Sequence, residues 1–248
     1  MLKKERQAYI LHQINLHNRV LSSMLCEEMN VSEDTVRRDL QELSEGGKLV
    51  KVHGGALSPS FSQVPSPKTV YSRPQKTIIA TKAVSLIKNG MFILTSGGST
   101  IIELARALPP QLNATFITGS IPVIVEYLNH PNIEVIVIGD KISKNSMITT
   151  GGEAINKIKQ IKADLCFLGI NAIDRVHGIT DIDWDVVQLK KSMIESSQKV
   201  ISLTISEKVN TFQPFKICDI TDIDMLITEL PANDKLLKPY RQSGIEIL

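Results

Sequence analysis

Apolar residues in the first part of the chain recur at the spacing of an α-helix. Val36, Leu40 and Leu43 stand at i, i+4 and i+7, which places them on one face of a helix. Similar patterns at 2–18 and 22–29 predict two earlier helices. The alternation of polar and apolar residues at 48–52, followed by two glycines, predicts a strand and a tight reversal. Two helices, a turn, a third helix and a small hairpin predict a winged helix-turn-helix domain at residues 1–57.

The third helix has clear ends and a polar face. Ser32 can accept a hydrogen bond from a free N–H group at its start, and Gly46-Gly47 ends it. The residues that lie opposite or beside the apolar stripe are Asp34, Thr35, Arg37, Arg38 and Gln41. In a helix-turn-helix domain this face enters the major groove of DNA, which makes the arginines candidates for reading bases.

A plainer interpretation is that these arginines are only solvated charge. Residues 1–58 carry eight Lys/Arg and eight Asp/Glu, so the net charge of the domain does not favour DNA. The placement of the charges does favour it, because the hairpin at 48–57 contains no acid. Clustered basic groups, more than net charge, decide where phosphates bind.

Residues 3–57 closely resemble the N-terminal domain of DeoR-family bacterial transcriptional regulators. The hallmark of that domain is V-S-x-x-T-V-R-R-D-L followed by G-x-L-x-x-x-H-G-G-A, which this chain carries at 31–40 and 47–56. The resemblance implies that Thr35, Arg37 and Arg38 meet bases and backbone. It also implies that Lys51 and His53 meet flanking phosphates or the minor groove. The residues predicted to bind DNA are therefore Ser32, Asp34, Thr35, Arg37, Arg38, Gln41, Lys48, Lys51 and His53.

The pattern changes after the hairpin. Residues 58–75 hold several prolines and serines with little periodicity, which is typical of a linker. From residue 76 to residue 248, short apolar runs alternate with helical patterns. Strands are predicted at 91–95, 114–118, 133–139, 164–170, 200–204 and 225–228, and helices at 77–87, 100–108, 121–128, 153–161, 185–197 and 233–242. This alternation predicts a larger Rossmann-like α/β domain with a mostly parallel sheet.

One glycine-rich turn in this second domain connects a strand to a helix. Ser96-Gly97-Gly98-Ser99-Thr100 stands where backbone N–H groups and the helix dipole favour an anion. The two glycines allow close approach of a ligand, and Ser99 and Thr100 add hydroxyl donors. The turn matches neither the dinucleotide-binding motif nor the P-loop. An ordinary tight turn with a helix cap remains the alternative.

Polar groups at other strand ends strengthen the prediction of a small-molecule site, because the ends of parallel strands meet at one edge of a sheet. The residues predicted to bind the effector are Ser96, Gly97, Gly98, Ser99, Thr100, Gly119, Ser120, Asn171, Thr180 and Lys208. Each has a plainer role, such as helix entry or surface charge. The acidic loop Asp181–Asp185 is a further polar group at this edge, and a solvated loop is its plainer role. Lys190 and Lys191 are expected at the surface or near a helix end.

Residues 76–230 resemble, more loosely, the effector domain of the same family. That domain is similar to ribose-5-phosphate isomerase and senses a phosphorylated sugar or related metabolite. Gly98-Ser99-Thr100 corresponds to the family's phosphate loop, and Lys208 to the lysine of its D-S-S-K segment. Several family positions differ: Ser96 replaces a common Asp, Gly119 an Asn, Asn171 an Asp and Val186 a Glu. The anion loop is thus kept while groups that would hold sugar hydroxyls are changed.

These observations predict a DNA-binding transcriptional regulator, a repressor of carbohydrate-metabolism genes that responds to a phosphorylated metabolite. Its expected partners are double-stranded operator DNA, that metabolite and further copies of the chain. An isomerase is the alternative, although Asn171 and Val186 cannot act as bases. A DNA-binding architectural protein whose second domain only oligomerises is a third hypothesis.

Composition adds limits to these hypotheses. The net charge is +2, and the three cysteines are far apart without metal-ligand spacing, so no metal or cofactor is predicted. The chain shows no signal-peptide pattern and no uncharged apolar run that could span a bilayer. A cytoplasmic protein without a membrane partner is expected.

Overall fold

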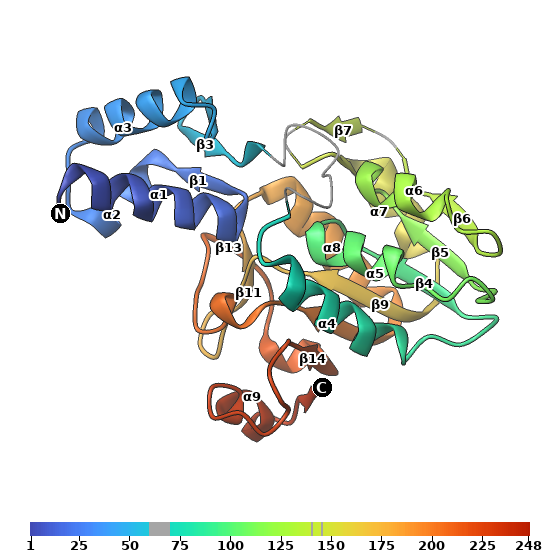
Figure 1. Cartoon of the computed structure of the whole chain (residues 1–248). Helices are drawn as coiled ribbons and strands as arrows, with labels where there is room; N and C mark the ends of the chain where they lie inside the picture. The colour runs from blue at the N-terminus through green and yellow to red at the C-terminus, as the bar shows by residue number, and fades with distance from the viewer. Residues whose placement is uncertain (60–69, 140, 145) are drawn as a thin grey trace. The chain divides into compact units, whose positions relative to one another are not determined.

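A computed structural model describes residues 1–59, 70–139, 141–144 and 146–248 (Figure 1). The chain divides into two compact units, Met1–Tyr71 and Ser72–Leu248. Of the predicted linker at 58–75, positions 60–69 lie outside the described residues, and a helix already begins at Arg73.

The first unit contains the predicted helices and a three-stranded sheet. The helices are α1 (Lys3–His17), α2 (Ser22–Met29) and α3 (Glu33–Glu45). The hairpin consists of β2 (Val50–Val52) and β3 (Gly55–Leu57), and β1 (Arg19–Leu21) pairs with the other side of β3. The sequence patterns did not predict β1. Gly55 is required by this pairing, because a Cβ atom there would lie 1.9 Å from the carbonyl oxygen of Val20.

The core of the first unit follows the apolar stripes. Val36 and Leu40 of α3 are buried against Ile10 and Ile14 of α1 and against Leu25 of α2. Burial of these side chains is the main stabilising contribution available to a domain this small. The polar face of α3 is therefore left exposed.

The second unit is built on a parallel sheet with the strand order β15-β14-β12-β9-β4-β5-β6. Its strands are β4 (Phe92–Thr95), β5 (Thr115–Thr118), β6 (Glu134–Val137), β9 (Ala163–Gly169), β12 (Ser197–Leu203), β14 (Met225–Ile227) and β15 (Glu246–Ile247). The chain enters the sheet at β4 and extends it through β5 and β6. It then crosses to the other side of β4 at β9, so the order reverses between these two strands.

Helices cover both faces of this sheet (Figure 1). They are α4 (Arg73–Val84), α5 (Ser99–Arg106), α6 (Ile121–Tyr127), α7 (Gly152–Lys159), α8 (Trp184–Glu195) and α9 (Lys238–Gln242). Helix α5 packs against α4, α6 and β9, while α7 and α8 pack together on a core that includes Leu94 and Cys166. Helix α4 begins four residues earlier than predicted, because Pro74 fits the first turn of a helix, where no N–H group is needed. The predicted helix at 233–242 is shortened to Lys238–Gln242.

Two antiparallel elements escaped the sequence analysis. One is a two-stranded sheet formed by β7 (Lys141–Ser143) and β8 (Ile148–Thr150). The other is a three-stranded sheet formed by β10 (Ala172–Asp174), β11 (Gly178–Asp181) and β13 (Phe215–Cys218). Short 3₁₀ turns lie at Ser206–Lys208 and Ile220–Asp222. Strands of three or four residues are too short to display a reliable alternation of apolar and polar positions.

Candidate DNA interface and ligand site

The exposed face of α3 carries a compact charged group. Ser32 caps the helix by accepting a hydrogen bond from the Thr35 N–H group at 3.4 Å. The side chains of Arg37 and Arg38 are 70% and 77% exposed, and each donates to the carboxylate of Asp34 at 2.6 Å. Asp34 thus holds two guanidinium groups side by side, in a position from which a DNA groove can be reached.

The hairpin adds further basic groups to the same unit. Lys51 of β2 donates from its Nζ atom to Gln41 of α3 at 2.9 Å, and Gln41 donates to Glu45 at 2.7 Å. This chain of contacts fixes the hairpin relative to α3. Lys48 is exposed in the bend before β2, and His53 is exposed in the turn between β2 and β3. All nine predicted DNA-binding residues therefore belong to α3, its cap, the hairpin or the bend that connects α3 to the hairpin.

Asp39 is a residue of the same motif with a different role. Its side chain is 2% exposed and accepts from Arg6 Nε of α1 at 2.7 Å, with a second contact from the same guanidinium at 3.3 Å. A bidentate pair of this kind fixes the angle between two helices. The arginines of the R-R-D segment point outward, whereas its aspartate joins α3 to α1.

The turn after β4 has the backbone geometry of an anion site. Gly98 has φ +108°, a conformation that L-residues rarely adopt, and no side chain caps α5. In the described part of the chain, the N–H groups of Gly98, Ser99, Thr100 and Ile101 donate to no acceptor. The hydroxyl groups of Ser99 and Thr100 are likewise unpaired among the described residues. Free donors at the positive end of a helix favour a phosphate or carboxylate.

This turn is held tightly against the end of β9. Ser96 N–H donates to the carbonyl of Phe167 at 3.1 Å, and the Ser96 hydroxyl accepts from the Gly169 N–H group at 2.8 Å. A Cβ atom on Gly169 would lie 2.6 Å from the Gly97 carbonyl oxygen. The turn therefore lies where the strand order reverses, which is the usual ligand position in open parallel sheets.

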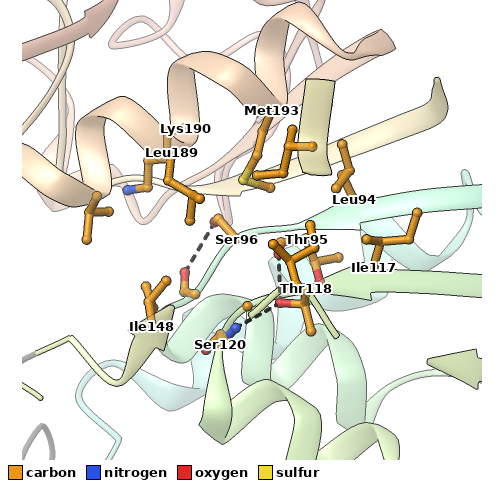
Figure 2. A pocket seen from close by; sticks show the side chains of 15 residues that line it. Leu94, Thr95, Ser96, Ile117, Thr118, Ser120, Ile148, Leu189, Lys190 and Met193 are labelled. Carbon is orange, nitrogen blue, oxygen red and sulfur yellow. Dashed lines mark hydrogen bonds between the residues drawn. The ribbon is translucent and has the colours of Figure 1, made fainter. Parts of the chain in front are cut away.

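A pocket opens beside the turn (Figure 2). Its volume is about 10 Å³, which is room for a single water molecule. Of the predicted effector residues, Ser96, Gly97, Gly119 and Ser120 line it. The remaining six do not: Gly98, Ser99 and Thr100 continue the turn into α5, Asn171 bonds to Asp181, Thr180 belongs to β11 and Lys208 follows β12.

At the pocket wall lies a buried ion pair that the sequence patterns did not predict. Lys190 of α8 is 4% exposed and donates to Asp181 at 2.7 Å, and Asn171 donates to the other carboxylate oxygen at 2.7 Å. Burial alone would raise the pKa of Asp181, but Lys190 and the other donors leave it below its usual value. The plainer role of a solvated loop therefore does not hold at Asp181, and the expectation that Lys190 lies at the surface or near a helix end is wrong. The reason is that α8 packs its Lys190 face directly on β11.

Two more lysines are buried near this pair. Lys208 donates to the Ile170 carbonyl at 3.1 Å, immediately after the end of β9. Burial lowers its pKa to about 7; Lys76 and Lys190 also lower it, while Asp181 and Glu207 oppose the shift. Burial likewise lowers the pKa of Lys76 to about 8, against the attraction of Glu103 and Glu207. Lys208 is therefore a buried cation and not the surface charge of the plainer interpretation.

The spacing of apolar residues along α8 and α4 carries a signal for two of these buried lysines. Lys190 lies four residues after Val186 and three before Met193, on the buried stripe of α8. Lys76 precedes Ile79, Ala80 and Ala83 in the same way on α4. A lysine within an apolar stripe is a candidate for burial with a partner. The partner itself, Asp181, could not be inferred from spacing.

Comparison with known proteins identifies both units. Residues 6–61 match the DeoR-like helix-turn-helix domain, and residues 72–230 match the DeoR C terminal sensor domain. The chain belongs to the DeoR family of transcriptional regulators. It is 30% identical to the HTH-type transcriptional regulator GolR of Listeria innocua, over 100% of this chain and 98% of that protein. It is 29% identical to the transcriptional repressor GlcR of Bacillus subtilis, over 100% of this chain and 96% of that protein. It is 27% identical to the glycerol-3-phosphate regulon repressor of Escherichia coli, over 100% of this chain and 99% of that protein.

Two solved structures illustrate distant likenesses to this DeoR-family regulator. A D-ribose-5-phosphate isomerase in complex with phospho-erythronic acid has a TM-score of 0.40 and 16% identity over 54% of this chain and 52% of that chain. The delta subunit of eIF2B from Chaetomium thermophilum has a TM-score of 0.46 and 18% identity over 82% of this chain and 65% of that chain. Likenesses at this level carry no argument about activity.

Membership of a family of DNA-binding regulators means that the chain is not an enzyme, and the isomerase alternative is not supported. The structure agrees with this at the residues in question. Asn171 is engaged by Asp181, and Val186 contributes a buried apolar side chain to the pocket. Among the described residues, no helix is both long and apolar enough to cross a bilayer.

Proposed function

We propose that this DeoR-family regulator represses genes of carbohydrate metabolism and that a phosphorylated metabolite, bound at the turn after β4, changes its affinity for operator DNA. The four unpaired N–H groups at the start of α5 are the observation that carries the proposal. They offer a dianion several donors together with the positive end of a helix dipole. The proposed site of action is the cytoplasm.

On the DNA side, the proposal assigns the nine residues of α3 and the hairpin to the operator. Arg37 and Arg38 are candidates for base contacts in the major groove, because they are exposed and held together by Asp34. Lys48, Lys51 and His53 are candidates for phosphate contacts, which supply affinity without sequence information.

On the effector side, the proposal assigns Gly98, Ser99 and Thr100 to the phosphoryl group. Lys208 and Lys76, buried behind the same strand ends, supply positive potential that favours an anion. Asn171 and Thr180 would then act indirectly, since Asn171 is bonded to Asp181 and the Thr180 hydroxyl accepts from the Gln213 N–H group at 2.8 Å.

We further propose that the chain acts as a homo-oligomer. One winged domain of this size reads a short site, and pairing two of them on adjacent half-sites raises affinity through effective concentration. Effector control then requires that the metabolite bind the DNA-competent and DNA-free arrangements with different affinity.

Sequencing the genomic fragments retained by the purified protein provides the operator and the regulated genes. A labelled operator then allows phosphorylated metabolites to be screened by fluorescence anisotropy. The double variant Ser99→Ala/Thr100→Ala is expected to bind the operator as the native chain does, while needing about tenfold more metabolite for the same response, since two hydroxyl donors to the anion are lost.

Thr77→Ala/Ser85→Ala is the matched control, because both hydroxyls bond only to carbonyl groups of their own helix region, those of Arg73 and Lys82. An unchanged response in the Ser99/Thr100 variant would remove the turn from the site. Silence of the native protein across phosphorylated metabolites would favour the architectural hypothesis instead.

A further inference from the structure

One edge of the seven-stranded sheet is open. The strand order ends at β6, which pairs with β5 on one side, and in the described part of the chain no strand pairs with its other side. Glu134 and Ile138 donate their N–H groups to carbonyl groups on the β5 side at 3.0 and 2.9 Å. Because successive residues of a strand direct their backbone groups to opposite sides, those of Val135 and Val137 point away from β5. They are therefore available to another strand.

The side chains around this open edge are apolar and exposed. In β6, Ile136 is 42% exposed and Val137 is 51% exposed. Helix α6 packs beside β6 (Figure 1) and adds Val125, which is 40% exposed, and Leu128 at its end, which is 73% exposed. The only charged residue within β6 is Glu134, and the strand contains no proline or glycine. An edge strand of this composition is suited to pairing with another chain.

The opposite edge of the same sheet is protected. Its strand, β15, is two residues long, and Glu246 in it accepts from Lys199 of β12 at 3.1 Å. Short length and charge are the features by which soluble proteins keep sheet edges from pairing. Strand β6 lacks both features, so it is the edge of this sheet that fits a partner.

A second copy of the chain fits this edge in backbone groups and in charge. If two β6 strands run antiparallel about a two-fold axis at Ile136, Val135 of each copy lies opposite Val137 of the other. The outward N–H and C=O groups of both strands then pair with each other. Glu134 lies opposite Ile138 in this register, so the carboxylates of the two copies do not face each other, as they would if like charges opposed the association.

We propose that two copies of this regulator associate through β6 and join their parallel sheets into one sheet around a two-fold axis at Ile136. This inference rests on the homo-oligomer of the proposed function and adds the surface through which it forms. The axis is perpendicular to the joined sheet, so the α6 helices of both copies lie on the same face. There Val125 and Leu128 can cover the same residues of the second copy, which removes apolar surface from water.

A charge exchange at the axis tests this arrangement. Ile136→Lys and Ile136→Glu each place two like charges directly opposite each other, where Cα atoms of an antiparallel pair are about 4.5 Å apart. In sedimentation velocity on the full-length protein, each variant alone is expected to have half the mass of the native assembly. An equal mixture of the two is expected to regain the native mass, because each lysine then faces a glutamate.

Val176→Lys and Val176→Glu are the matched controls, since Val176 is 76% exposed in the turn after β10. Both should keep the native mass. Thermal melting of each variant establishes that it is folded, which is expected because Ile136 is partly exposed.

A cysteine variant tests the same contact without added charge, and it serves if the charged variants do not fold. Ile136→Cys is expected to form a disulfide-linked dimer on mild oxidation, because the Cα spacing across the axis lies within the range that a disulfide bridges. The native chain and Val176→Cys should stay unlinked on a non-reducing gel.

The outcomes separate this inference from the proposal on which it rests. Native mass in both charged variants, or absence of the linked dimer in Ile136→Cys, would overturn the β6 interface and leave the homo-oligomer standing. Loss of association that the mixture does not restore would overturn the two-fold axis at Ile136. A native chain that sediments as a monomer would overturn both.

Discussion

Individual residues near the ligand site are charged and buried to an unusual degree. Lys76, Lys190 and Lys208 are each less than 9% exposed, and Asp181 is 2% exposed. Lys190 and Asp181 neutralise each other directly, whereas Lys208 donates to the Ile170 carbonyl and has a pKa lowered mainly by burial. A buried lysine of this kind costs stability, because its charged form loses hydration. Its retention beside an anion site is consistent with a role in binding.

This cost should be visible as a pH dependence of stability. The pKa of Lys208 in the folded chain is about 7, below its ordinary value of 10.5. Between these values the unfolded chain binds a proton that the folded chain lacks, so the free energy of unfolding rises with pH. Lys208→Met removes this contribution. From pH 6.5 to 8.5, the free energy of unfolding of the native chain should therefore rise by about 1–2 kcal/mol more than that of the variant.

Urea denaturation at pH 6.5, 7.5 and 8.5 measures the free energy of unfolding of the native chain and of Lys208→Met. Subtracting the values of the variant from those of the native chain cancels the contribution of other titrating groups, such as Lys76. The exposed Lys162, changed to Met, is the control and should show the native dependence. Parallel curves for the native chain and Lys208→Met would contradict a lowered pKa of Lys208.

At the scale of elements, α3 divides its polar residues between two tasks. Arg37 and Arg38 face outward with Asp34, while Asp39 is buried against Arg6 of α1. One short motif thus contains both the proposed DNA contacts and the contact that sets the angle of the helix. Substitutions one residue apart should therefore have different consequences.

Arg38→Ala is expected to weaken binding to the selected operator by about 1–3 kcal/mol if Arg38 reads a base, while binding to unrelated DNA changes little. Asp39→Ala should instead destabilise the domain by about 3 kcal/mol, because it leaves the Arg6 guanidinium partly buried without its carboxylate. Anisotropy with operator and scrambled DNA, together with thermal melting, distinguishes the two effects. Equal loss on both DNAs would reassign Arg38 to the phosphate backbone.

The whole molecule consists of two units with separate cores. The first unit buries its own apolar cluster, and the second is organised around the parallel sheet. Because the proposed ligand site and the proposed DNA contacts lie in different units, each unit should keep its own binding property when it is separated from the other. The coupling between them should be lost.

A fragment of residues 1–71 is expected to fold and to bind operator DNA more weakly, by about 100-fold, because the proposed oligomer contacts and their effective concentration are absent. Its binding should not respond to any phosphorylated metabolite. Circular dichroism and anisotropy measure these properties, and full-length protein is the control. Native affinity in the fragment would argue against a contribution from self-association.

Much of this architecture could be predicted because its signals are local. The stripe of Val36, Leu40 and Leu43, the cap at Ser32 and the stop at Gly46-Gly47 lie within a few residues of the structure they specify. The same is true of the apolar strands and of the glycine-rich turn at 96–100. The helix-turn-helix, the α/β class of the second unit and the position of the glycine-rich turn between a strand and a helix therefore followed from the sequence by itself.

Tertiary structure decided what surrounds that turn. The order of the sheet brings the ends of β4 and β9 together, although they are separated by more than 70 residues, and packing of α8 on β11 pairs Lys190 with Asp181. Strand β13 pairs with β11 from more than 30 residues further along the chain, and the local pairs β7-β8 and β10-β11 are too short to show in the sequence pattern. Spacing along a chain encodes which face of an element is apolar, but it does not encode which elements meet. The pairing of Lys190 with Asp181 and the open edge of the sheet at β6 depend on that second kind of information.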